Sequence, residues 1–269
     1  MGVLPRHFEN WKLEDRYIET HVIKKLPANW KVSAEAFLEA YHVLETHSEG
    51  VYTAGDANAD YDIFGDHISR FVHTIGYTSP HITENRPTEQ EIFDILMGRR
   101  TKEGSGQKLP EGTSAREAYA GHVQETMKER FKQDFSHLTV TETIDSIEYF
   151  AFPNAFFFPG LQLSMVYRFR PNGVDGALFD LLFLRPKPVD GPCPPPPEPF
   201  QLEIEDSYTK CPGTEFLGAV YDQDTNNLLS QTKGFKSSFK KGQSLGNYQE
   251  ARTRHFHQTI DKYLENING

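Results

Sequence analysis

The sequence predicts an α+β domain in which a long C-terminal helix packs against an antiparallel β-sheet. The first observation is a set of aromatic and aliphatic runs, DSIEYFAF, LQLSMVYRFR and ALFDLLFL, between residues 145 and 184. The turn formers PN, PG and PNGVDG separate them, as between consecutive antiparallel strands. The second is NYQEARTRHFHQTIDKYLENI, residues 247–267, which has the pattern of a long terminal helix. No internal repeat or second core is evident, so we expect residues 1–269 to form a single domain.

The earlier elements follow from local signals. The run YIETHVIKK, residues 17–25, predicts a strand, and residues 35–47 carry helix formers with Ser33 as a possible cap and Gly50 as a stop. Residues 50–85 are polar and irregular. Thr88, followed by acidic residues, predicts a short capped helix that ends near Gly98.

The remaining segments alternate between helix and loop. We expect a mobile loop at residues 99–114 and a helix at 114–133. After the strands we expect a proline-rich extended connection at 186–199 and a second helix at 214–234. Gly234 is expected to end the second of these helices. The elements before the strands are therefore helical insertions into the sheet domain.

Composition excludes several classes of protein. The net charge is −10 and no run of lysine or arginine occurs, which argues against a nucleic-acid partner and against membrane attachment through basic residues. No apolar stretch approaches the roughly 20 residues that span a bilayer. Cys193 and Cys211 form no C-x-x-C motif, so a disulfide framework and a cysteine-held iron–sulfur cluster are not expected. We expect a soluble cytoplasmic protein.

Two histidines five residues apart, His42 and His47, raise the question of a metal site. Residues five apart on a regular α-helix point about 140° from each other, so both could ligate one ion only if the helix widened or ended between them. The alternative is a pair of partly exposed histidines near a helix end, where the helix dipole favours their positive charge.

A carboxylate would complete the two-histidine, one-carboxylate set that binds iron in non-haem Fe(II) oxygenases. The residues themselves leave several candidates open. Glu39 and Glu45 lie near in sequence, whereas Asp222 and Asp224 lie far away, in VYDQDTNN. Asp224 shares a helical face with Leu217 and Val220, but without further context a side-chain cap or a surface charge is the more common role for such a residue. Asp222 is expected to lie toward solvent.

Several segments, in order, resemble the catalytic domain of Rieske-type ring-hydroxylating oxygenase large subunits. NWKVSAEAFLEAYHVLETH, residues 29–47, resembles the iron-binding segment of that family. EYFAFPNAFFFPG resembles its strand with an F-P-N signature, and YRFRPNGVDGALFDLLFLRPKP the hairpin that follows. VYDQDTNNLLSQTKGFKS resembles the helix with the third ligand, and YQEARTRHFHQTIDKYL the terminal helix. The resemblance covers residues 17–264.

The resemblance implies a helix-grip fold of the START/Bet v 1-like kind. It also implies a mononuclear, non-haem Fe(II) site made by His42, His47 and Asp224, which activates O2 to hydroxylate an apolar, aromatic substrate by mono- or dioxygenation. Such chemistry is typical of aromatic hydrocarbon catabolism. The acidic residue of the motif falls on Glu39, which would bridge the iron ligand to a Rieske cluster on the neighbouring subunit of a ring trimer.

The substrate would lie against side chains next to these ligands. Helical phase suggests Val43, Leu217 and Val220, and the sheet motif suggests Phe152 and Asn154, although core packing is the alternative for each.

One departure from the family matters for function. The C-x-H and C-x-x-H motifs that hold a [2Fe-2S] cluster do not occur here, so no such cluster is expected in this chain. A Rieske ferredoxin with its reductase, or a Rieske-containing subunit, would have to supply electrons. Either the sequence is a catalytic domain cut from a longer chain, or it is a naturally short relative.

The competing hypothesis is a ligand-binding or partner subunit without turnover. A hydrolase has little support, because no G-x-S-x-G motif occurs.

Overall fold

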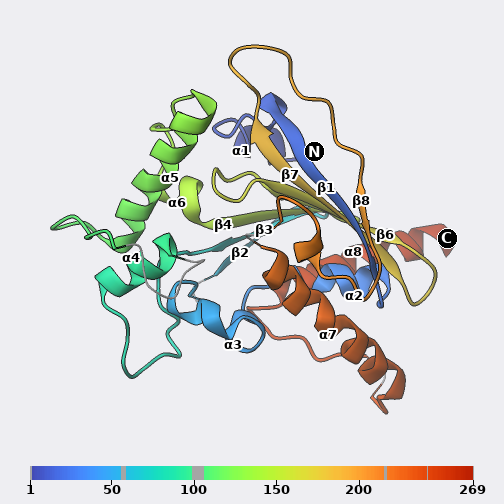
Figure 1. Cartoon of the computed structure of the whole chain (residues 1–269). Coiled ribbons are helices and arrows are strands. Elements are labelled where there is room, and N and C mark those ends of the chain that lie inside the picture. The colour runs from blue at the N-terminus through green and yellow to red at the C-terminus, as the bar shows by residue number, and fades with distance from the viewer. Residues whose placement is uncertain (1, 56–58, 99–105, 215–216, 241, 269) are drawn as a thin grey trace.

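An eight-stranded β-sheet forms the centre of the molecule (Figure 1). The computed structural model describes residues 2–55, 59–98, 106–214, 217–240 and 242–268. The strand order is β2-β3-β4-β5-β6-β7-β1-β8, and all neighbours are antiparallel except β1 and β8. The strands are β1 (Arg16–Leu26), β2 (Asp60–Phe64), β3 (Ile68–His73), β4 (Ser146–Ala151), β5 (Ala155–Phe158), β6 (Met165–Pro171), β7 (Ala177–Pro186) and β8 (Phe200–Leu202).

Helices lie on both faces of this sheet (Figure 1). Those on the face that carries the larger aromatic core are α2 (Trp30–Glu35), α7 (Gly218–Ser237) and α8 (Ala251–Asn268). Those that pack with the smaller second core are α1 (Leu4–His7), α4 (Glu89–Met97), α5 (Ala115–Phe131) and α6 (Val140–Ile144). The remaining short elements are α3 (Val43–Thr46), η1 (Leu13–Asp15), η2 (Ser48–Tyr52) and η4 (Tyr208–Lys210). The predicted α+β class, with an antiparallel sheet and a long terminal helix, is confirmed.

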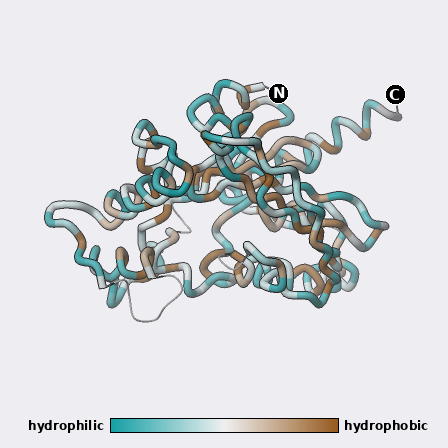
Figure 2. Tube along the Cα trace, turned by 45° about the horizontal axis from the view of Figure 1, so that its top comes forward, coloured by the Kyte–Doolittle hydropathy of each residue, from teal (hydrophilic) through white to brown (hydrophobic). Residues whose placement is uncertain are grey.

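The aromatic core explains how α8 holds the sheet. Phe256 of α8 is fully buried, and its ring meets Phe150 of β4 edge-on at 5.4 Å and Trp30 of α2 at 5.8 Å. Because side chains alternate along a strand, Phe150 faces α8 while Tyr149 faces the second core. Figure 2 shows that the hydrophobic segments concentrate inside the molecule and that the C-terminal end of α8 projects from its body.

The helices that were predicted to begin near Thr88 and Ser114 both form, as α4 and α5. Thr88 and Glu91 form a reciprocal capping box at the start of α4, and Ser114 and Glu117 form one at the start of α5. Each box satisfies two backbone N–H groups that the first helical turn leaves without partners. In contrast, α7 continues past Gly234 to Ser237, so the predicted stop at that glycine is wrong.

The predicted helix over residues 35–47 is also wrong. Asn29, not Ser33, caps α2 by accepting hydrogen bonds from the backbone N–H groups of Lys31 and Val32, and α2 ends at Glu35. The backbone N–H groups that a continuous helix would use point elsewhere. That of Ala40 donates to the Tyr61 hydroxyl at 3.1 Å, and that of His42 donates to Glu39 Oε2 at 3.1 Å. Side-chain acceptors therefore interrupt the helix and leave α3 as a separate single turn.

The structure contains strands that the sequence patterns did not predict. Residues 50–85, expected to be irregular, contain β2 and β3, and the short β5 and β8 were also missed. Strand β2 is half-exposed at the sheet edge, so its sequence DYDIF lacks a buried alternating pattern. Of the expected loop at 99–114, residues 99–105 lie outside the described part, and 106–114 contain neither helix nor strand.

The described residues contain neither a disulfide nor a membrane-length helix. Cys193 is exposed and Cys211 is buried, and neither takes part in a disulfide bond. Each helix in the described ranges is too short or too polar to cross a bilayer. Residues 187–199, the proline-rich connection between β7 and β8, contain no helix or strand.

Candidate metal centre

His42 and His47 are brought together by the single helical turn α3. His42 is the residue before its first position and His47 the residue after its last. The backbone of His47 leaves the helical region, with φ −121° and ψ 54°, so its side chain is not held at the angle that a continuous helix would impose. The two imidazole rings meet with their centroids 5.3 Å apart. A helix end between the histidines therefore gives the pair a common direction.

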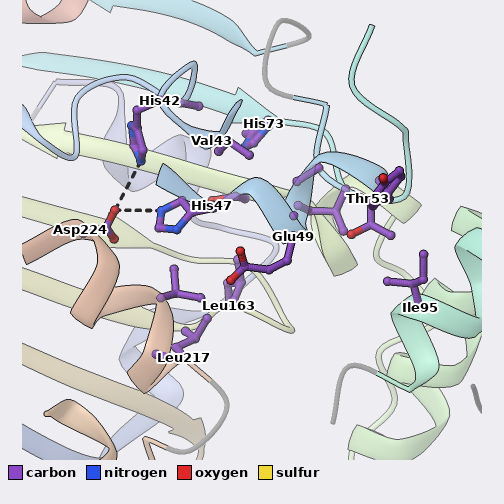
Figure 3. Close-up of a pocket in the computed structure, with 18 of the residues that line it drawn as sticks. His42, Val43, His47, Glu49, Thr53, His73, Ile95, Leu163, Leu217 and Asp224 are labelled. Atoms are coloured by element: carbon purple, nitrogen blue, oxygen red, sulfur yellow. Dashed lines mark hydrogen bonds and ion pairs between the residues drawn. The ribbon is translucent and has the colours of Figure 1, made fainter. Parts of the chain in front are cut away.

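Asp224 of α7 faces both histidines. Its Oδ1 atom lies 2.8 Å from His47 Nε2 and 3.4 Å from His42 Nε2 (Figure 3). Asp224 is only 8% exposed, although the same helix is largely polar. One nitrogen from each histidine and one carboxylate oxygen lie within 4.8 Å of one another, a separation that allows all three atoms to bind one metal ion. Among the described residues, no other group of three such side chains meets this criterion.

The second nitrogen of each imidazole has its own acceptor. His42 Nδ1 donates to Glu39 Oε1 at 2.7 Å, and His47 Nδ1 donates to Gln223 Oε1 at 2.7 Å. The amide nitrogen of Gln223 in turn donates to Glu49 Oε1 at 2.8 Å. Hydrogen bonds at Nδ1 fix the ring orientation and leave both Nε2 atoms directed at Asp224, the usual arrangement around metal-binding histidines.

Helix α7 is positioned by its first two turns. Asp222, which sequence reasoning directed toward solvent, is half-buried and accepts hydrogen bonds from the Ser207 hydroxyl at 2.5 Å and the backbone N–H of Tyr208 at 3.1 Å. Gly218 packs so closely against η4 that a Cβ atom there would lie 2.9 Å from Thr209 Cγ2. These contacts hold the helix end, and with it Asp224, against the core.

The charges of the three candidate ligands depend on one another. Burial alone would lower the pKa of His42, but hydrogen bonds to Asp224 and Glu39 outweigh it and raise that pKa to about 10. The same balance raises the pKa of His47. Burial alone would raise the pKa of Asp224, whereas the hydrogen bonds from both histidines lower it. Asp224 and the two imidazoles thus favour one another's charged forms.

This set of donors fits a divalent transition metal. Two neutral imidazole nitrogens and one carboxylate oxygen would balance one of the two positive charges and leave other coordination positions open. A cation at this point would compete with protons for the same imidazole nitrogens, so metal binding would depend on pH. The buried carboxylate of Asp224 needs a positive charge beside it, and either a protonated histidine or a metal ion can provide that charge.

Comparison with known families identifies the catalytic unit. The model of the family described as ring hydroxylating alpha subunit (catalytic domain) matches residues 6–266. The chain belongs to this family. Members of the family use mononuclear iron and are oxygenases. A comparison with curated protein sequences gave no match.

Solved structures of family members share the fold at low sequence identity. The quaternary ammonium Rieske monooxygenase CntA in complex with substrate L-carnitine has a TM-score of 0.54 and 12% identity, and the alignment covers 96% of this chain and 52% of that one. Naphthalene 1,2-dioxygenase with indole bound in its active site has a TM-score of 0.51 and 13% identity, covering 98% and 58%. This chain therefore spans little more than half the length of these Rieske oxygenase alpha subunits.

A cavity of about 1250 Å³ opens beside the three candidate ligands. The apolar part of the cavity lining includes Val43, Leu217 and Val220, the three residues that helical phase suggested. Figure 3 shows Val43 and Leu217 near the histidines and Ile95 of α4 at the opposite side of the cavity. The structure thus brings these three predicted substrate contacts together with the ligand set.

Phe152 and Asn154, also predicted as substrate contacts, do not line this cavity. The Phe152 ring stacks on Tyr263 of α8 at 5.3 Å, and Asn154 Nδ2 donates to the carbonyl of Phe169 at 2.7 Å. Both side chains fix the β4–β5 turn and its contact with α8. Glu45, an alternative ligand by sequence proximity, is exposed on α3.

The sequence reasoning missed several residues of the site. Gln223 could have been found, because it directly precedes the candidate ligand Asp224. Glu148 of β4 and Tyr167 of β6 line the cavity from the sheet, but nothing in the sequence showed which strand faces would meet the histidines. His73 also lines the cavity, from β3.

Proposed function

We propose that this chain is the iron-binding catalytic domain of an oxygenase that activates O2 and hydroxylates an apolar or aromatic substrate. The observation that carries the proposal is the convergence of His42 Nε2, His47 Nε2 and Asp224 Oδ1 beside a large cavity. Bound Fe(II) would supply open coordination positions and redox chemistry for dioxygen. The resemblance in the iron-binding segment and the family membership support iron over other divalent ions.

Each residue around the proposed ion has a separate task. His42, His47 and Asp224 hold the ion, while Glu39 and Gln223 keep the two imidazole rings oriented through Nδ1. The apolar wall around Val43 excludes water and binds the body of the substrate.

Electrons in this proposal come from a Rieske centre on another domain or chain. Glu39 is the proposed point of entry, because its carboxylate touches both the ring and the backbone N–H of His42. The proposal includes a trimer in which a neighbouring subunit or a Rieske ferredoxin approaches Glu39, and a cytoplasmic location. It further includes mono- or dioxygenation of the aromatic-hydrocarbon type.

A second candidate function is a ligand-binding or partner subunit without independent turnover. The absence of the cluster-binding motifs from these 269 residues favours it, since this part of the chain cannot deliver electrons on its own. Retention of all three ligand side chains argues for the enzyme, because a binding module has no chemical need for them.

Turnover with a separate electron donor distinguishes the two. The chain, loaded anaerobically with Fe(II), is mixed with a Rieske ferredoxin and its reductase, NADH, oxygen and indole as the probe substrate. We expect hydroxylated product, detected by mass spectrometry, from the wild type and none from Asp224→Ala. Product with peroxide but none with the donor would show only a competent iron site. Absence of product under both conditions would favour the binding-subunit function.

A further inference from the structure

A buried carboxylate lies in the floor of the cavity. Glu148 of β4 is 1% exposed, yet it lines the cavity together with Ser146 of the same strand. In the sheet register Glu148 is opposite Phe71, and Ser146 is opposite His73. Phe71 and His73 line the cavity as well. A carboxylate in such surroundings is costly unless its charge and its lone pairs have partners, so Glu148 needs an explanation.

Arg252 of α8 is the partner of one oxygen of this carboxylate. Its Nη2 donates to Glu148 Oε1 at 2.7 Å, and the guanidinium is completely buried. The other guanidinium nitrogens donate to the Ser69 hydroxyl and to the carbonyl of Leu38, each at 3.1 Å. Three hydrogen bonds, to β3, to β4 and to the segment between α2 and α3, hold Arg252 in place. The Glu148 carboxylate is therefore fixed in one orientation, with Oε1 directed at α8.

The second oxygen, Oε2, has acceptor capacity left over. An ionised carboxylate has about four acceptor positions. In the described part of the chain, the hydrogen bond between Oε1 and Arg252 is the only one that Glu148 makes. Oε2 is also not among the polar atoms that are sealed from solvent without a partner, so it touches open space. The open space that Glu148 lines is the cavity.

Glu148 also lies near the candidate metal ligands. Burial raises the pKa of its carboxyl to about 7, against the charge of Arg252, and the charges of His42 and Glu39 act on the same pKa. Above that pH the group is a carboxylate. A substrate bound next to the histidines would thus come within the reach of a fixed hydrogen-bond acceptor, whereas its other neighbours include the rings of Phe71, Phe158 and Tyr167.

We propose that Glu148 Oε2 accepts a hydrogen bond from the substrate, and that the substrate class is an aromatic or apolar compound bearing a hydroxyl or an amine rather than a plain hydrocarbon. In naming a substrate, this inference rests on the proposed oxygenase function. Glu148 would act as a specificity-determining residue: the aromatic walls bind the body of the compound, and the carboxylate fixes its orientation. A hydrogen bond left unmade at a buried acceptor is expensive, so compounds without the donor would bind more weakly.

Equilibrium dialysis with two matched probes tests this inference. 2-Naphthol carries an O–H donor, and 2-methoxynaphthalene keeps the oxygen but has no donor. Binding is measured at pH 8 to the full chain, with and without anaerobically loaded Fe(II). We expect 2-naphthol to bind about tenfold or more tightly than the methoxy compound, as for a hydrogen bond to a charged group. In Glu148→Gln, which keeps shape but removes the charge, the preference should fall at least fivefold.

Two further variants keep the result interpretable. Glu148→Leu combined with Arg252→Met removes the ion pair as a unit and should abolish the preference if Glu148→Gln does not fold. Asp180→Asn is the matched control, because Asp180 is an equally buried carboxylate, paired with Arg170 at 2.6 Å, outside the cavity lining. This control should keep the preference.

Equal binding of the two probes to the wild type, or a preference that survives in the double variant, would overturn the inference. Dialysis requires no turnover, so the outcome is separate from that of the proposed function. A preference that depends on Glu148 in protein that retains no iron would support the hydrogen-bonding role while removing the oxygenase proposal. Stoichiometric iron with no preference between the probes would overturn the hydrogen-bonding role of Glu148 and leave the oxygenase proposal standing.

Discussion

Replacing Arg252 by methionine is expected to lower the free energy of unfolding by about 3–5 kcal/mol, the usual cost of leaving one partner of a buried ion pair uncompensated. Arg252 and Glu148 are 0% and 1% exposed, so water cannot take the place of the lost guanidinium. The Ser69 hydroxyl and the Leu38 carbonyl would lose their donors as well. Urea unfolding followed by circular dichroism measures the change, provided that the unfolding free energy of both proteins falls with the same slope against urea concentration.

The double variant Arg252→Met with Glu148→Leu should recover most of this loss, because apolar residues of similar volume can replace a buried ion pair. Lys262→Met is the control on the same helix. Its partner Asp66 and Lys262 itself are both more than half exposed, so the free energy of unfolding should remain nearly unchanged. A single variant as stable as the wild type, or a double variant as unstable as the single one, would show that the pair does not hold α8 to β3 and β4.

Glu39→Gln is expected to reduce turnover with a Rieske donor by about 10–100-fold, the range measured for hydrogen-bonding partners of metal-binding histidines. The variant retains acceptors for the ring and the backbone N–H of His42 but removes the negative charge. Iron content should stay within about twofold of the wild type. Product formed with peroxide should also be retained if the main role of Glu39 is in electron transfer.

Glu45→Gln provides the comparison, since Glu45 is an exposed carboxylate on the turn between the two histidines. It should leave donor-driven turnover unchanged. If Glu39→Gln lost peroxide-driven and donor-driven product equally, Glu39 would only hold the imidazole ring. Unchanged turnover in Glu39→Gln would remove it from the electron path.

Local signals were sufficient where neighbouring residues in the sequence make the decisive contact. The cap at Thr88 is an example, because its capping box closes over three residues. The strands of the hairpin region were also predictable, since turn formers separate apolar runs. Patterns of this kind gave the α+β class and the long terminal helix.

Prediction failed where a distant side chain decides the backbone. The interruption of the helix before His42 depends on Tyr61, 21 residues away from Ala40, and on the carboxylate of Glu39. Edge strand β2 is polar, so its pairing with β3, and not its own sequence, makes it a strand. In both places tertiary contacts override local propensity.

The candidate site was only partly readable for the same reason. Spacing alone could not choose among Glu39, Glu45, Asp222 and Asp224, and the assignment to Asp224 came from the resemblance. Asp224 meets His47 across 177 residues, through an arrangement of α7 that depends on Asp222 and Gly218. Glu148 was invisible until the sheet register placed it beside Phe71 in the cavity floor.

Iron per chain is the most direct test of the account. The wild type and Asp224→Ala are loaded anaerobically with Fe(II), desalted and measured by elemental analysis, with circular dichroism to establish that both are folded. We predict close to one iron per chain in the wild type and little in the variant, because two histidines alone would remain at the site. Equal iron in both proteins, or none in either, would contradict the assignment of His42, His47 and Asp224 as a metal centre.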